Sequence, residues 1–441
     1  MPKSFISILG TNDYLECLHK FPDGEISKEP VKYVQEDLIK KYCKDWTEND
    51  EIRIFLTKDA KEKNWLDNGH YDREGKQIQN SGLESRIKLI GIKSKILHYD
   101  INEGFNEEEI WEIFQSIYDS FKEDEEVIVD ITHSFRSLPM LLITLLNFAK
   151  QVKKIRVLGI YYAAFENLGP IHKVREIPVD QRVAPVLDLT SFSQLQDWTN
   201  ATYDFIRNAN ITSLKKLVQS SKKELTNTID NKSARDVIVE IDRILQEINL
   251  CRGNYIIDYD FDNLKKNIDM LRNLDLSIRP LPILIDELLE KIKNFSYPGI
   301  ENLVNSVEWC IEHNLFQQAI TLLQETVITI ILKKLDSDFR IRDLRKAVSN
   351  CFFIVKENIE KNNWHNLNKI HEKLTEKVLE LDFVKKISGD YEYLSDIRND
   401  INHGGFIKDS KPAESIKSRL RNSVNRLKPM ILDFNEGNYK C

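Results

Sequence analysis

The chain has 441 residues, 41% hydrophobic and 30% charged, a composition typical of a folded protein with a sizeable core. At about 100–200 residues per domain, this length predicts two or three domains. The net charge of −7 excludes a generally basic nucleic-acid coat, so any nucleic-acid site must be local. No apolar run reaches the roughly 18 residues that cross a bilayer, and the amino-terminal run is too short for a signal peptide. We therefore expect a cytoplasmic protein with no membrane partner.

Cysteine and histidine spacing gives no support for a metal site. The six cysteines are scattered without a C-x-x-C pair, which favours buried free thiols in a reducing compartment. His365 and His371 lack the spacing and the acidic partner of a helical zinc site. No G-x-x-x-x-G-K-[ST] motif is present, which argues against nucleoside triphosphate hydrolysis. The sequence predicts no metal and no resident cofactor.

Residues 1–190 alternate between short apolar runs and helical patterns. Strands are expected at Ser4–Leu9, Ile52–Leu56, Ile96–Tyr99, Val127–Asp130 and Ile155–Tyr162. Helices are expected at Glu107–Phe121 and Met140–Lys150, from their apolar spacing. Strands that alternate with helices predict a Rossmann-like, doubly wound parallel sheet.

After Pro185 the periodicity becomes helical almost throughout. We expect a helical middle region at 191–300, with a break at Tyr255–Asp262 and a kink near Pro280 and Pro282, and a helical domain at 301–441. The expected helices are Leu189–Asn210, Ile211–Leu250, Leu264–Phe295, Val304–Ile311, Phe316–Leu335, Ile341–Ile359, Trp364–Leu381 and Tyr391–Ile401. The fold class is thus α/β followed by all-α.

Two polar loops follow predicted strands at one edge of the sheet. Carboxyl ends of parallel strands form ligand crevices, and helix amino termini there bind phosphates. The candidate ligand-binding residues are Gly10, Thr11 and Asn12 in the first loop, and Thr132, His133, Ser134, Arg136 and Ser137 in the second. The structural alternative is that the Ser and Thr residues only cap a helix and that His133 is a core residue whose hydrogen bonds are satisfied within the fold.

A second constellation lies near the carboxyl end. Arg398, Asn399 and His403 precede Gly404-Gly405, which predicts a helix stop at His403. A His can transfer protons near neutral pH, and an Arg can hold a phosphate and stabilise its developing charge. Attack by an RNA 2′-hydroxyl on the adjacent phosphorus needs no metal. The alternative is a solvated helix end with a capping His, because R-x4-H alone is a weak pattern.

These motifs resemble a known family. Asp130-Ile131-Thr132-His133-Ser134-Phe135-Arg136 resembles the D-x-T-H-G-x-R signature of CRISPR-associated CARF domains, with Ser134 in place of the usual Gly, and Leu9–Tyr14 resembles their first loop. Arg398–His403 resembles the R-x4–6-H motif of HEPN ribonucleases, in which an Asn often follows the Arg. The order of the two motifs is similar to that of CARF–HEPN ancillary ribonucleases of type III CRISPR systems.

The resemblance implies an allosteric antiviral endoribonuclease. A homodimer, or a higher oligomer, would bind a cyclic oligoadenylate across its two-fold axis, with cyclic tetra-adenylate the first choice and cyclic hexa-adenylate the second. Binding would align two Arg398/His403 pairs, which would cleave single-stranded RNA to 2′,3′-cyclic phosphate ends. Two alternatives remain open. One is a non-catalytic sensor dimer that signals through protein contacts, and the other is a CARF domain that also degrades its activator near Thr11, His133 and Ser134.

Overall fold

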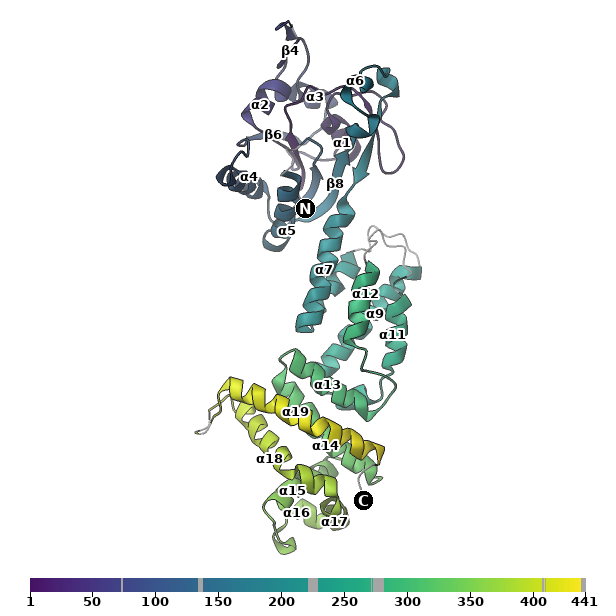
Figure 1. Cartoon of the computed structure of the whole chain (residues 1–441), viewed down its shortest axis with the longest axis vertical. Coiled ribbons are helices and arrows are strands. Elements are labelled where there is room, and N and C mark those ends of the chain that lie inside the picture. Colours follow the sequence, from purple (N-terminus) through teal and green to yellow (C-terminus); the bar gives the residue numbers. More distant parts are fainter. Residues whose placement is uncertain are drawn as a thin grey trace. The chain divides into compact units, whose positions relative to one another are not determined.

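The structure is a computed structural model that folds into two compact units, Met1–Asp197 and Trp198–Cys441 (Figure 1). It describes residues 1–72, 74–133, 138–220, 229–270, 272, 281–406, 408 and 410–437. Because each unit has its own core, each is described by itself. The finer division of the helical part at residue 300 stays a prediction.

The amino-terminal unit is built on a seven-stranded sheet of order β2-β9-β8-β7-β1-β3-β6. Every neighbouring pair of strands is parallel except β8 and β9. The strands are β1 (Lys3–Leu9), β2 (Leu18–Lys20), β3 (Glu51–Leu56), β6 (Lys95–Asp100), β7 (Glu126–Asp130), β8 (Arg156–Ala163) and β9 (Val183–Asp188). The predicted Rossmann-like sheet is confirmed. Among its strands, the sequence patterns missed the three-residue β2 and β9, which is antiparallel to β8.

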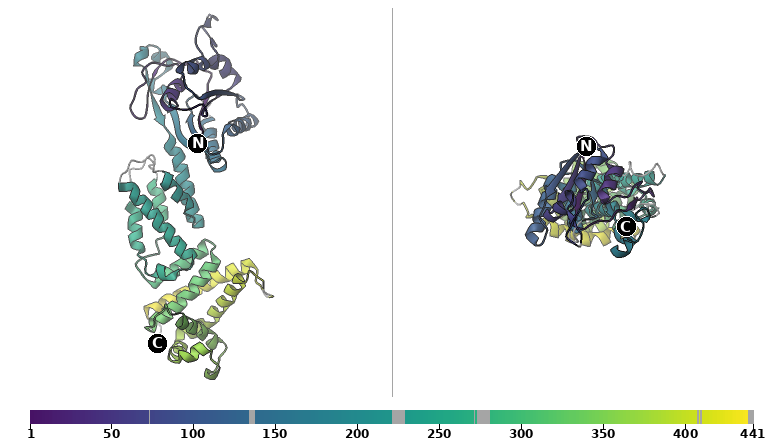
Figure 2. Two further views of the ribbon diagram at one scale, coloured as in Figure 1. Left: turned by 180° about the vertical axis from the view of Figure 1, so that it is seen from behind. Right: turned by 90° about the horizontal axis from the view of Figure 1, so that it is seen from above.

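Side chains alternate between the two faces of this sheet, and helices cover both faces (Figure 2). In β1, Phe5 packs into the cluster with α1 (Val34–Tyr42) and α3 (Leu83–Ile90). Ile6 packs on the other face with α4 (Glu107–Ser120) and α5 (Leu138–Val152). Burial of each such side chain stabilises the fold by roughly 1.5–3 kcal/mol, which fixes the register of the central strands.

Several short elements connect the main ones. After β3 come α2 (Lys58–Ala60), a π-helix (Lys61–Trp65) and a hairpin of β4 (His70–Tyr71) and β5 (Gln77–Ile78). After β8 come η2 (Phe165–Leu168), α6 (Ile171–Val174) and η3 (Val179–Gln181). None of these has enough periodicity to be predicted from sequence.

All regular structure described after β9 is helical. The helices are α7 (Thr190–Asn208), α8 (Thr212–Ser220), α9 (Ile229–Asn249), α10 (Gly253–Ile257), α11 (Phe261–Met270), α12 (Leu281–Lys291), α13 (Ile300–Glu312), α14 (Phe316–Lys334), α15 (Arg342–Lys356), η6 (Lys361–Asn363), α16 (Asn366–Ile370), α17 (Glu372–Glu380), α18 (Asp382–Asn402) and α19 (Ala413–Glu436). Among these described helices, none combines the length and apolarity needed to span a bilayer.

Two helical predictions need refinement, and one helix was missed. The expected break within Tyr255–Asp262 is present but narrower than predicted. It falls at residues 258–260, between α10 and α11, because Ile256, Ile257 and Phe261 are buried in those helices. Pro282 lies in the first turn of α12, where a missing N–H costs little, while Pro280 lies outside the described residues. The long helix α19 was not predicted.

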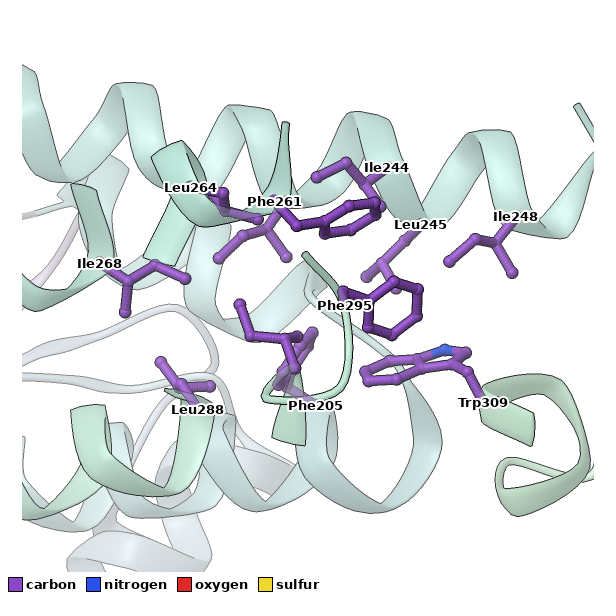
Figure 3. A pocket seen from close by; sticks show the side chains of 12 residues that line it. Phe205, Ile244, Leu245, Ile248, Phe261, Leu264, Ile268, Leu288, Phe295 and Trp309 are labelled. Carbon is purple, nitrogen blue, oxygen red and sulfur yellow. The ribbon is translucent and has the colours of Figure 1, made fainter. Parts of the chain in front are cut away.

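The helical unit has a dense aromatic core (Figure 3). Phe261 and Phe295 lie 4.5 Å apart between ring centroids, and Phe205 lies 5.9 Å from Trp309. The cavity enclosed by this cluster measures only about 20 Å³. The aromatic cluster therefore serves to pack the core, and the candidate functional residues of this unit lie outside it.

Candidate functional site

The two polar loops predicted from sequence lie side by side at the carboxyl edge of the sheet. Strands β1 and β7 are parallel neighbours, with Ser7 opposite Asp130. A Cβ atom on Gly10 would lie 2.8 Å from the carbonyl oxygen of His133 and 2.3 Å from the hydroxyl of Tyr14. Only glycine fits there, so the absence of a side chain is what lets the loops touch.

The structure places only some of the candidate ligand residues. Thr11 is half-buried and Asn12 is exposed in the first loop. Ser134, Arg136 and Ser137 lie outside the described residues. A ligand contact by any of these side chains therefore stays a prediction.

Asp130, the last residue of β7, fixes the second loop through hydrogen bonds. Its carboxylate accepts from the hydroxyl of Ser7 at 2.7 Å and from the backbone N–H of Thr132 at 2.9 Å. The Thr132 hydroxyl donates to the same carboxylate and accepts from the N–H of Ala163 at 2.9 Å. Burial raises the pKa of Asp130 although these hydrogen bonds oppose the shift. The hydroxyl of Thr132 is therefore engaged in hydrogen bonds that fix the conformation of the loop.

His133 is an uncharged member of the site. Its ring packs on Tyr14 with centroids 4.0 Å apart, and its Nε2 atom is inaccessible and has no partner among the described residues. Burial lowers its pKa to about 3, with a smaller contribution from the charge of His19. A neutral imidazole cannot neutralise a phosphate. His133 can still stack or accept a hydrogen bond.

The charge that contributes to the lowered pKa of His133 belongs to His19, a buried residue of β2. Its Nδ1 lies 2.8 Å from Asp37 of α1, and both side chains are about 4% exposed. Burial opposes protonation, but the hydrogen bonds to Asp37 and Cys17 outweigh it and raise the pKa of His19 to about 9. Sequence reasoning missed this pair, because the pairing of the three-residue β2 leaves no local signal.

Asn64 was also missed, and it contacts the first loop directly. Its amide nitrogen donates to the carbonyl oxygens of Gly10 at 2.8 Å and of Asn12 at 2.9 Å. Its Oδ1 accepts from the hydroxyl of Tyr33 and from Nε2 of His70. A lone Asn in a charged segment has no pattern that would have revealed this role.

The carboxy-terminal motif ends a helix as predicted. Helix α18 stops at Asn402 with His403 as its C-cap, and Gly404 and Gly405 follow with φ of 63° and 74°. The buried side chain of Asp400 accepts from the backbone N–H of Lys411 at 2.9 Å and so ties down the following loop. Asp400 is therefore occupied within the fold.

The three predicted catalytic residues differ in exposure. Asn399 and His403 are exposed, and Arg398 is half-buried. The Nε atom of Arg398 is inaccessible and without a partner among the described residues. No hydrogen bond joins the side chains of Arg398 and His403, both of which are described. The site within one chain thus has a free cation and a free imidazole that are not yet arranged around a substrate.

A cavity of about 540 Å³ lies along α14, and no residue of the Arg398–His403 motif is among its described lining residues. Gln317 donates to the side chain of Asn402 at 3.0 Å. Thr321, Glu325 and Thr329 follow Gln317 on one helix face at intervals of four residues and line the cavity. Arg252, Arg340 and Arg345 contribute three guanidinium groups to its wall.

The amino-terminal unit has the features of a sheet-edge ligand-binding domain, and comparison with known proteins assigns its family. Residues 6–166 match the model of the CARF domain of CRISPR system endoribonuclease Csx1. CRISPR-associated protein MJ1674 of Methanocaldococcus jannaschii is 24% identical over 263 residues, which cover 58% of this chain and 37% of the relative. The match identifies residues 6–166 as similar to the CARF domains of CRISPR-associated proteins. Arg398–His403 lies outside the CARF match.

Proposed function

We propose that this protein is an endoribonuclease of type III CRISPR antiviral defence that a cyclic oligoadenylate activates. The observation that carries the proposal is the CARF domain itself, whose Gly10 and His133 loops meet at the carboxyl edge of the sheet. That edge is where α/β folds bind phosphorylated ligands. The Arg398–His403 motif in the same chain supplies the chemistry of RNA cleavage.

The activator is a ring of adenylates bound across the two-fold axis of a homodimer, or of a larger assembly built from it. An even-membered ring matches that symmetry, so cyclic tetra-adenylate is the first choice and cyclic hexa-adenylate the second. Two copies of the Gly10–Asn12 loop would contact it from opposite sides. Activation requires that the ring binds the cleavage-competent state more tightly than the inactive state.

Cleavage proceeds by attack of the RNA 2′-hydroxyl on the adjacent phosphorus. The 2′-oxygen–phosphorus bond forms, the phosphorus–5′-oxygen bond breaks, and the product ends in a 2′,3′-cyclic phosphate. One His403 removes the 2′-hydroxyl proton or delivers a proton to the leaving oxygen, and its counterpart in the second copy serves the other step. Arg398 stabilises the charge on the phosphate, and Asn399 donates a hydrogen bond.

The substrate is single-stranded RNA, encountered in the cytoplasm, and the cavity along α14 is large enough to hold part of a bound strand. Its three arginines suit a phosphate backbone, although Glu325 already engages Arg345 and Asp338 already engages Arg340. Recognition would therefore depend on the backbone rather than on the bases. Little sequence preference is expected.

One alternative involves the chemistry of His133. A CARF domain that degrades its own activator needs a proton acceptor near the ring, but His133, with a pKa of about 3, is a weak base. The sensor alternative, in which Arg398 and His403 have no chemical role, predicts no cleavage at all.

The experiment is RNA degradation by the full chain with each cyclic oligoadenylate in turn, in EDTA. We expect cleavage with cyclic tetra-adenylate and none without a ring. Cleavage that needs added metal would contradict the proton-transfer scheme. Activator binding without any cleavage would favour the sensor.

A further inference from the structure

We propose that Asn64 is the positioning residue of the activator site. It fixes the Gly10–Asn12 loop and links that loop to the β4–β5 hairpin through His70. This inference rests on the proposed function, because it assigns a role in binding the same ligand. Asn64 itself is fully buried and would not touch the activator.

The amide of Asn64 uses all of its hydrogen-bonding capacity. Both N–H bonds go to the first loop, at 2.8 Å to the Gly10 carbonyl and 2.9 Å to the Asn12 carbonyl. Its Oδ1 accepts from Tyr33 at 3.2 Å and from His70 at 2.8 Å. Four bonds from one buried side chain leave it a single orientation. The loop backbone is therefore held at two points.

The direction of the two carbonyls matters for an anionic ligand. A carbonyl oxygen carries partial negative charge and would repel a phosphate. Because Asn64 is buried, the oxygens of Gly10 and Asn12 that bind it are turned into the fold. A loop that is already held in this form does not pay the entropic cost of ordering when the ligand binds. The avoided cost is the usual source of affinity in a pre-organised site.

Asn64 is itself fixed by an unusual piece of backbone. It lies in the π-helix Lys61–Trp65, a form that occurs mostly in short stretches and often at functional sites. Two glycines pack against the carbonyls of this helix. A Cβ atom on Gly69 would lie 2.1 Å from the oxygen of Glu62, and one on Gly82 would lie 2.3 Å from the oxygen of Trp65. Close backbone packing therefore sets the position of Asn64.

These glycines flank the hairpin that contains His70. At its base, the N–H of Asn68 donates to the carbonyl of Asn80 at 2.8 Å, and the N–H of Gly82 donates to Asp67 at 2.7 Å. Figure 1 shows β4 at a projecting tip of this unit. The hairpin, the π-helix and the ligand loop thus form one hydrogen-bonded chain. A movement of the hairpin would reach the loop through His70 and Asn64.

The test uses the full chain and direct titration with cyclic tetra-adenylate. Asn64→Ala removes both loop bonds, and we expect affinity to fall about 10- to 100-fold. Asn64→Asp places a carboxylate against two carbonyl oxygens, so its affinity should fall further. The matched control is Asn368→Ala, which deletes another fully buried Asn whose amide donates to a backbone carbonyl, at 2.9 Å to Ala347.

The control separates positioning from general stability. Both alanine variants should lower the melting temperature, but only Asn64→Ala should weaken binding, with the maximal cleavage rate at saturating activator nearly unchanged. Binding within about threefold of wild type would overturn the inference. If Asn64→Ala does not fold, Tyr33→Phe removes one bond to Asn64 and should still weaken binding severalfold, and unchanged binding would overturn the inference equally.

A failure of the proposed function gives a different result. If the wild-type chain binds neither cyclic tetra-adenylate nor cyclic hexa-adenylate, the proposed ligand is wrong. Amide hydrogen exchange of residues 10–13 still reports whether Asn64 fixes the loop. Faster exchange in Asn64→Ala than in wild type and Asn368→Ala is expected, and equal exchange would remove the positioning role.

Discussion

The loops of the CARF domain and the Arg398–His403 motif are built in contrasting ways. Beneath the loops, Asp130 and Asn64 are buried and fully engaged with neighbouring groups. In the motif, His403 is exposed and the inaccessible Nε of Arg398 has no partner among the described residues. The first region is organised within one chain, whereas the described side chains of Arg398 and His403 form no hydrogen bond with each other. Under the proposed function, a second copy or the RNA orients them.

This difference between the two regions is what a ligand-activated nuclease, as proposed above, would require. A sensor gains affinity when its loops are already in place, because ordering them on binding would cost free energy. A nuclease that must stay silent gains control when its catalytic groups are arranged only in the activated assembly. An unpaired buried guanidinium nitrogen costs about 1–3 kcal/mol, which a second copy or the RNA phosphate would recover.

The largest expected effect comes from the motif. His403→Ala removes the proton-transfer group and should lower RNA cleavage about 10²- to 10⁴-fold while leaving activator affinity unchanged. Cleavage rates with saturating cyclic tetra-adenylate measure this. The control is His365→Ala, an exposed histidine of the same unit that caps α16. A similar loss in both variants would mean that the motif has no special role.

A smaller effect is expected at the loops. Gly10→Ala puts a Cβ atom 2.8 Å from the His133 carbonyl, so the two loops must separate. We expect activator affinity to fall about 10- to 100-fold, with cleavage restored at high activator concentration. Titration calorimetry measures the affinity. Gly389→Ala in α18, where a Cβ meets nothing within 4 Å, is the matched control and should bind normally.

The smallest effect is a pH dependence that belongs to the CARF domain alone. The pKa of His19 is raised from 6.5 to about 9, so its ion pair with Asp37 contributes its full stabilisation below pH 6.5 and loses it as the pH rises through 9. The melting temperature of this unit should fall by about 5 °C over that window. His19→Gln should flatten that slope, and an unchanged slope would show that other groups cause it.

The elements that could be predicted are those with a local sequence pattern, and the contacts that could not be predicted depend on tertiary packing. Strands such as β1 and β7 were predictable because buried parallel strands read as continuous apolar runs, and the rule for their carboxyl ends placed Gly10 beside His133. The helix stop at His403 followed from Gly404-Gly405. The partners of Asn64 and His19 were not predictable, because they depend on a π-helix and on the pairing of the short strand β2. The burial of the Arg398 Nε likewise depends on tertiary packing.

Cleavage of one RNA sequence and of its fully 2′-O-methylated form, both in EDTA and with saturating cyclic tetra-adenylate, tests the central claim most directly. If the 2′-hydroxyl is the nucleophile, the RNA is cut to 2′,3′-cyclic phosphate ends only when the activator is present, and the methylated strand stays intact. Cleavage of the methylated strand, or of RNA without the activator, would contradict a metal-independent ribonuclease that the CARF domain controls.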